Sequence, residues 1–230
     1  MAMQDELIAR QMRRWELDQR LHHRFARDEA AAHGRRDVLT VSRERGSGGT
    51  IVGMMVAKEL GWDFYDREII DGVAQRTGAE PEAIAAHDER ATTFMHQVLI
   101  QLLEGKHPTE AQYLRSLVRV MRSLRARGNA VIMGRGGHIV LPDSLRVRVV
   151  APLDLRVERV AELESLSLDE ARHEILSADR DRRHFLKSAF GVDADDPTYF
   201  DLVLNTGAMS LEHAAHLVHC AVETRRAGPG

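Results

Sequence analysis

Hydrophobic and polar positions divide the chain into segments of two kinds. Five short runs are rich in apolar and β-branched residues, which is typical of buried strands; they are residues 37–42, 62–66, 129–134, 146–151 and 200–206. The main segments between and after them have helical spacing, which predicts helices at 51–61, 67–78, 152–165, 167–189 and 210–226. Short apolar strands that alternate with helices predict an α/β fold, with a parallel five-stranded sheet covered on both faces.

Two helical segments are expected outside this alternation. Residues 4–32 have an apolar stripe at helical spacing and end at Gly34, so we expect residues 1–36 to form an N-terminal helical arm. The stripe predicts a packing surface, either on the main domain or in a homodimer with a second copy of the chain. Residues 80–128 contain no strand pattern and are interpreted as a helical insertion in a main domain that spans 37–230.

Composition narrows the functional classes. Of 230 residues, 43% are hydrophobic and the net charge is −3, so no overall basic field would hold nucleic acid. Cys220 is the only cysteine, which excludes a disulfide within the chain. With neither a signal peptide nor an apolar membrane span in the pattern, we expect a cytoplasmic protein with no membrane partner.

The segment VSRERGSGGT (41–50) lies between the first predicted strand and its helix, where phosphate-binding loops occur. The usual pattern is G-x-x-x-x-G-K-[ST]. Gly48 matches the second glycine and Thr50 the hydroxyl residue, but Arg43 replaces the first glycine and Gly49 replaces the lysine. On this pattern alone the match is weak, and a tight turn without a ligand is the alternative interpretation.

Four blocks of sequence together resemble the cytidylate kinase-like family, a branch of the nucleoside monophosphate kinases. The blocks are TVSRERGSGGTIVGMMVAKELGWDFYDREII (40–70), AVIMGRGGHIVLPDSLRVRVVAPLDLRVERV (130–160), DRDRRHFLK (179–187) and FDLVLNTGAMSLEHA (200–214). They occur in the family's order over about residues 38–225, and the missing lysine is a feature of this branch. The resemblance implies a three-layer α/β/α P-loop kinase fold.

The resemblance also implies how ATP and Mg²⁺ would be held. Backbone amides of the loop would bind the donor's β-phosphate, and these residues are Gly46, Ser47, Gly48 and Gly49. Thr50 would place its hydroxyl on Mg²⁺, and Arg43 would supply the charge of the absent lysine. Asn205 and Thr206 match the loop around the donor's adenine in related kinases.

Acceptor and lid residues follow from the same comparison. Asp66, at the end of the second strand, is expected at the acceptor nucleotide or near the metal, although it is also a good N-cap. Arg135 follows the third strand and would contact the acceptor; Gly136 stands where many cytidylate kinases have an aspartate. The candidates nearer the lid are Arg156, Arg159, Asp179, Asp181 and Arg182, of which Arg182 is the first choice to cover the phosphates. Asp179 and Asp181 would bind the acceptor's ribose or orient the arginines.

The sequence therefore predicts a kinase that moves the γ-phosphoryl group of ATP to a nucleoside monophosphate, with CMP or dCMP as first candidates. A kinase for another small acceptor is the alternative within the same fold. A nucleotide-binding regulator without catalysis is the alternative from another class.

Overall fold

The computed structural model describes residues 37–68, 70–71 and 110–227. The chain divides into two compact units: residues 37–66 and 124–227 belong to one, and 67–68, 70–71 and 110–123 to the other. The predicted N-terminal arm and most of the predicted helical insertion lie outside the described residues, so both remain predictions. In the described residues, no helix combines the length and apolar character needed to cross a membrane.

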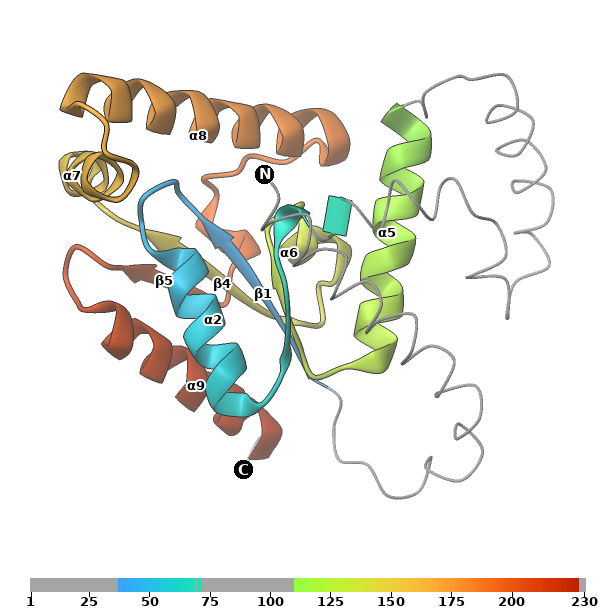
Figure 1. The fold of residues 1–230 in the computed structure, drawn as a ribbon. Coiled ribbons are helices and arrows are strands. Elements are labelled where there is room, and N and C mark those ends of the chain that lie inside the picture. Colours follow the sequence, from blue (N-terminus) through green and yellow to red (C-terminus); the bar gives the residue numbers. More distant parts are fainter. Residues whose placement is uncertain (1–36, 69, 72–109, 228–230) are drawn as a thin grey trace, which may run out of the picture. The chain divides into compact units, whose positions relative to one another are not determined.

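The larger unit contains a parallel sheet of five strands in the order β2-β3-β1-β4-β5 (Figure 1). The strands are β1 (Val38–Arg43), β2 (Asp63–Tyr65), β3 (Ala130–Met133), β4 (Leu145–Val150) and β5 (Leu202–Asn205). These match the five predicted strands to within one or two residues at each end. Val41 of β1 lies opposite Met133 of β3 and Val147 of β4, so the carboxyl ends of the strands meet at one edge of the sheet.

The predicted helices are also present where the structure describes them. They are α2 (Gly49–Leu60), α5 (Glu110–Arg127), α7 (Leu153–Glu164), α8 (Leu168–Phe190) and α9 (Leu211–Ala227). The pattern missed two short elements, α6 (Gly137–Val140) and the 3₁₀ turn η2 (Pro197–Tyr199). Each is too short to show a helical period. Helix α2 also begins two residues earlier than predicted, so Gly49 and Thr50 lie in its first turn.

Alternate side chains of β1 face opposite sides of the sheet. Leu39 and Val41 belong to the main apolar core, which helices α2 and α9 cover. Thr40 faces the other side, where its hydroxyl is hydrogen-bonded to that of Ser144 at 3.1 Å and its methyl group packs against Gly137 of α6. This burial on both faces explains why β1 is buried at four consecutive positions, residues 38–41.

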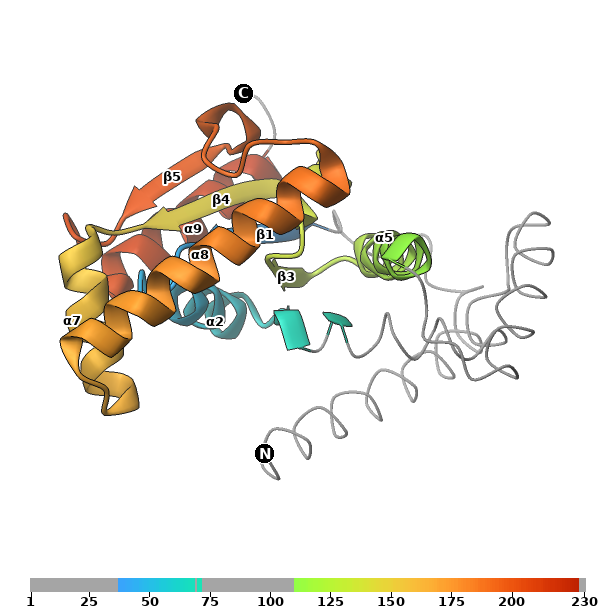
Figure 2. The same cartoon turned by 90° about the horizontal axis from the view of Figure 1, so that it is seen from above.

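Helices α7 and α8 form a hairpin with an apolar contact of its own, built from Val157, Val160, Ala171 and Ile175. Figure 2 shows α8 passing over the strands. Its side chains contact the segments that follow β1 and β3. The hairpin therefore lies at the carboxyl edge of the sheet, where open α/β sheets bind their ligands.

Candidate active site

The loop between β1 and α2 is a tight turn closed by its own serine. The backbone N–H and the hydroxyl of Ser47 both donate to the carbonyl of Glu44, at 3.3 and 2.9 Å. Gly46 and Gly48 have φ of +79°, the left-handed conformation that favours glycine. Both hydrogen-bond donors of Ser47 are therefore used within the turn itself.

The glycines of the loop lie so close to neighbouring residues that no side chain would fit at these positions. A Cβ atom on Gly46 would lie 2.8 Å from the carbonyl oxygen of Arg156, and one on Gly48 would lie 2.5 Å from Leu211. A Cβ on Gly49 would lie 2.6 Å from the Cβ of Arg43 and 3.0 Å from that of Val149. The position where the usual pattern has a lysine is therefore filled by the neighbouring strand residues.

Helix α2 begins at this loop without a side-chain cap, because its N-cap residue is Gly48. The first amides of a helix have no partner within the helix, and the helix dipole makes them attractive to anions. Thr50 lies partly buried in this first turn. Uncapped donors beside a compact glycine turn are a suitable setting for phosphate oxygens.

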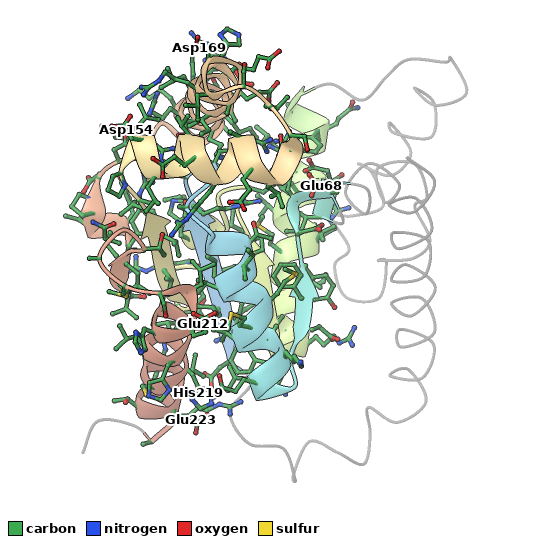
Figure 3. All side chains as sticks on the ribbon, turned by 60° about the vertical axis from the view of Figure 1, so that its left-hand side comes forward. Glu68, Asp154, Asp169, Glu212, His219 and Glu223 are labelled. Carbon is green, nitrogen blue, oxygen red and sulfur yellow. The ribbon has the colours of Figure 1, made fainter. Side chains whose placement is uncertain are left out.

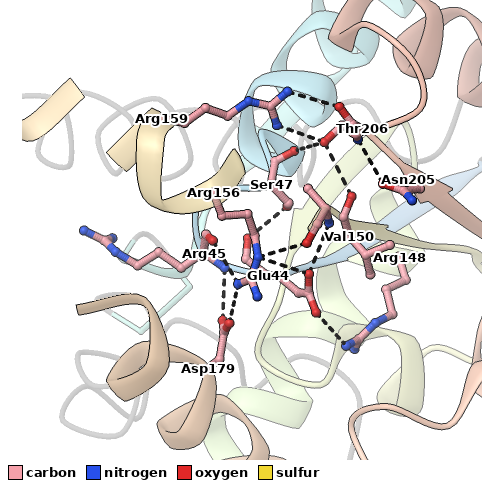
Figure 4. Close-up of polar contacts among 12 residues, drawn as sticks. Glu44, Arg45, Ser47, Arg148, Val150, Arg156, Arg159, Asp179, Asn205 and Thr206 are labelled. Atoms are coloured by element: carbon pink, nitrogen blue, oxygen red, sulfur yellow. Dashed lines mark hydrogen bonds and ion pairs between the residues drawn. The ribbon is translucent and has the colours of Figure 1, made fainter. Parts of the chain in front are cut away.

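The loop after β5 supports one side of the glycine loop (Figure 4). Buried Thr206 donates its hydroxyl to the carbonyl of Ser47 at 2.7 Å. Arg159 of α7 donates to the Thr206 hydroxyl at 3.0 Å and to its carbonyl at 3.1 Å. Asn205 accepts from the backbone N–H of Gly207 at 2.9 Å, which closes the turn. The structure therefore brings the predicted residues Asn205, Thr206 and Arg159 together with the loop.

Asp179 of α8 supports the other side of the glycine loop. One carboxylate oxygen accepts from the backbone N–H of Arg45 at 3.0 Å and from Arg182 at 2.8 Å. The other oxygen accepts from Arg156 at 2.6 Å. Asp179 and Arg156 are both more than nine-tenths buried, so the pair belongs to the interior and not to the surface.

Arg156 lies beneath the glycine loop and connects its parts. Its guanidinium donates to the carbonyls of Ala151 and Arg45, at 3.0 and 3.2 Å, and lies 3.5 Å from the Glu44 carboxylate. Glu44 in turn accepts from the backbone N–H of Ala151 at 3.2 Å. Arg45 does not pair with the adjacent Glu44 through its side chain but with Glu164, at 2.7 Å.

Arg43 reaches from the glycine loop towards the turn that follows β3. Its Cβ lies beside Gly49, and its guanidinium lies against Gly134, where an added Cβ atom would collide with it. Gly134, Arg135 and Gly136 have φ of +70°, +51° and +73°. A left-handed conformation is strained for arginine and is often found at functional sites.

The Arg135 side chain is held by helix α8. Its guanidinium carbon lies 4.9 Å from the ring centroid of Phe185, a cation–π contact. A Cβ on Gly136 would collide with the ring of Phe190, so this turn packs on the end of α8. Sequence reasoning missed Phe185, because nothing in the pattern indicates that residues fifty positions apart would meet.

The structure locates the remaining predicted residues, Asp66, Asp181 and Thr50, but does not test their roles. Asp66 is half-buried directly after β2, followed by helical residues, and Asp181 is exposed on α8. Among the described residues, no group of three or more His, Cys, Asp or Glu side chains could hold a metal ion. Thr50, the metal-binding residue expected from the sequence, lies in the first turn of α2, and its role stays a prediction.

His138 of α6 is buried on the face of the sheet opposite the main core. Its ring stacks on Phe200 with centroids 4.7 Å apart, and its Nε2 atom has no hydrogen-bond partner in the described part of the chain. Burial, together with the charges of Arg148 and Arg146, lowers the pKa of His138 to about 4. This histidine is therefore neutral near pH 7.

The family model for the cytidylate kinase-like family matches residues 38–208, a range that contains the glycine loop, the α7–α8 hairpin and the loop after β5. The chain belongs to the cytidylate kinase-like family. This confirms the resemblance found in the sequence and supports a P-loop phosphotransferase. A search of curated proteins gave no match.

One solved structure shares the fold, and two others are more distantly similar. An uncharacterised protein from Eubacterium ventriosum ATCC 27560 is 17% identical, with a TM-score of 0.62, and the alignment covers 81% of this chain and 98% of that one. Shikimate kinase from Bacteroides thetaiotaomicron is 16% identical, with a TM-score of 0.47 and coverage of 81% and 98%. Shikimate kinase from Acinetobacter baumannii, in complex with shikimate, is 16% identical, with a TM-score of 0.45 and coverage of 82% and 94%.

Proposed function

We propose that this cytidylate kinase-like chain transfers the γ-phosphoryl group of ATP to a nucleoside monophosphate, with CMP and dCMP as the first candidates. One observation carries the proposal: an uncapped helix start and a glycine turn lie at the carboxyl edge of the sheet, braced by Thr206 on one side and Asp179 on the other. Phosphoryl transfer needs such positioning and charge neutralisation more than it needs a strong base.

The donor nucleotide would bind along the glycine loop. The backbone amides of Gly46, Gly48 and Gly49 would hold the β-phosphate, and the loop at Asn205 and Thr206 would lie beside the adenine. Mg²⁺, when bound, would neutralise charge on the phosphates, and the Thr50 hydroxyl would hold it. The direct bond from Thr206 to the carbonyl of Ser47 supports a single donor site, because it joins these two loops.

Arg43 would supply the positive charge that a lysine gives in the usual pattern. The absence of space for a side chain at Gly49, and the Arg43 side chain that fills that space, support this exchange. The guanidinium lies at the turn that carries Arg135, the residue proposed for the acceptor. A planar guanidinium can hold phosphate oxygens in two places at once, which suits a residue between donor and acceptor.

Arg135 and Asp66 are the proposed acceptor contacts, and Arg182 is the proposed lid arginine. The strained backbone of Arg135 and its contact with Phe185 support a fixed direction for its side chain. Asp181, exposed on α8, is proposed to contact the acceptor's ribose.

One assay separates the proposed function from two others, a kinase with a different acceptor and a nucleotide-binding regulator. ADP release from ATP and Mg²⁺ is measured with CMP, dCMP, other nucleoside monophosphates and shikimate as acceptors, next to calorimetric binding of ATP. The proposal predicts release that depends on CMP or dCMP. Release with another acceptor alone would indicate a kinase of different specificity, and ATP binding without any release would indicate a regulator; either would contradict the proposal.

The role of Arg43 is tested by Arg43→Ala and Arg43→Lys. Loss of a positioned positive charge next to a transferred phosphoryl group is expected to lower kcat roughly 100-fold or more in Arg43→Ala, with a smaller loss in Arg43→Lys. Arg172→Ala is the matched control, because that arginine is exposed on α8 and pairs with the exposed Asp154. Unchanged kcat in Arg43→Ala would contradict the role of Arg43 while leaving the donor and acceptor open.

A further inference from the structure

Asp179 is a buried carboxylate whose two oxygens have different partners. One oxygen forms the ion pair with Arg156 at 2.6 Å. The other oxygen accepts from the backbone N–H of Arg45 in the glycine loop and from the guanidinium of Arg182 on α8. A carboxylate that served merely as the counter-ion of Arg156 would need no bond to the loop backbone.

We propose that Asp179 is a positioning residue that ties Arg182 of the lid helix to the backbone of the glycine loop. The same Asp179 oxygen accepts from the Arg182 guanidinium and from the Arg45 backbone N–H, so these two donors are held close together. This inference rests on the proposed function, in which Arg182 covers the phosphates. It adds that Asp179 fixes the position of the Arg182 side chain.

The surroundings of Asp179 favour this role over a bond to the acceptor. Its carboxylate is nine-tenths buried and already accepts three hydrogen bonds, so little of it is left for a sugar hydroxyl. Charge-assisted hydrogen bonds in a buried setting are strong and directional. Arg156, which also donates to the Arg45 carbonyl, holds the carboxylate in place.

The first test is a double-mutant cycle on kcat with Asp179→Asn and Arg182→Ala. Asp179→Asn keeps the size of the side chain but removes its charge, and it is expected to lower kcat roughly 10- to 100-fold, because small displacements of positioned groups are costly. In the Arg182→Ala background the same change should have almost no further effect on kcat. If the loss of kcat in the double variant equals the product of the two single losses, the proposal is overturned.

The second test needs no substrate and therefore separates this inference from the proposed function. Amide hydrogen exchange of the full chain is compared for the wild type, Asp179→Asn, Asp179→Glu and the control Asp154→Asn, whose aspartate is exposed on α7 (Figure 3). We expect roughly tenfold faster exchange in Asp179→Asn, confined to residues 44–49, a smaller change in Asp179→Glu and none in the control. Unchanged exchange in the loop, or faster exchange throughout the unit, would overturn the proposal even if the enzyme turns over.

Discussion

At the scale of single residues, the absence of the usual lysine has a packing reason. Arg43 and Val149 fill the space beside Gly49, so that position has no room for a Cβ atom. The sequence shows the exchange of glycine for lysine, but it does not show that the arginine six positions earlier occupies the same space. The glycine at position 49 is therefore required by the packing of this loop.

This packing predicts that restoring the lysine is harmful. Gly49→Lys should weaken ATP binding and lower the free energy of unfolding by about 1–3 kcal/mol, because an added side chain must displace Arg43 or Val149. Urea denaturation and calorimetry would measure both effects. The control Met54→Lys adds the same charge at an exposed position five residues further along α2 and should change little. Tighter ATP binding in Gly49→Lys would contradict this explanation of the loop.

His138 predicts a pH dependence of stability. Its pKa is about 4 in the folded protein, against an ordinary value of 6.5, so between these values the unfolded chain binds a proton that the folded chain does not. Stability should therefore fall as the pH falls from about 6.5 to about 4, by up to ~3 kcal/mol from this residue. Denaturation of the wild type and His138→Gln at pH 7 and pH 4.5 would measure it. The variant should lose less stability on acidification; an equal loss in both proteins would contradict the prediction.

At the scale of elements, α8 organises the site from a well-defined start. Ser167 is its N-cap and forms a reciprocal capping box with Glu170, as the sequence SLDE predicts. The two hydrogen bonds from Ser167 lower the pKa of Glu170 below its ordinary value. From this start the helix places Asp179 at the glycine loop and Phe185 at the Arg135 turn.

The cap predicts an effect on stability without an effect on chemistry. Ser167→Ala should lower the free energy of unfolding by about 1 kcal/mol, because the capping hydroxyl no longer satisfies the first amides of the helix. Ser188→Ala, at an exposed position within the same helix, is the control and should be nearly neutral. Chemical denaturation measures both variants. A loss of kcat in Ser167→Ala as large as its loss in Arg43→Ala would show that the cap acts on the site.

Elements were predictable from sequence where the signal is local. The strand runs, the capping box and the α2 helix each depend on neighbouring residues, and all were found. The short helix α6 was missed, because four residues show no period. Contacts of the site could not be predicted for a different reason. Asp179 with Arg45, and Phe185 with Arg135, join distant positions, and their pairing depends on how the α7–α8 hairpin lies on the sheet edge.

At the scale of the molecule, the parallel sheet brings separate loops to one edge and the hairpin fixes them there. The glycine loop follows β1, the Arg135 turn follows β3 and the Thr206 loop follows β5, so each of these strands contributes one part. The predicted insertion at 80–128 lies mostly outside the described residues.

The most direct measurement follows the γ-phosphoryl group itself. The full chain is incubated with Mg²⁺, γ-labelled ATP and either CMP or dCMP, and the labelled products are separated. The account predicts that the label appears in CDP or dCDP and that Arg43→Ala abolishes most of this transfer while Arg172→Ala does not. Label that stays in ATP, or that appears only as inorganic phosphate, would contradict it.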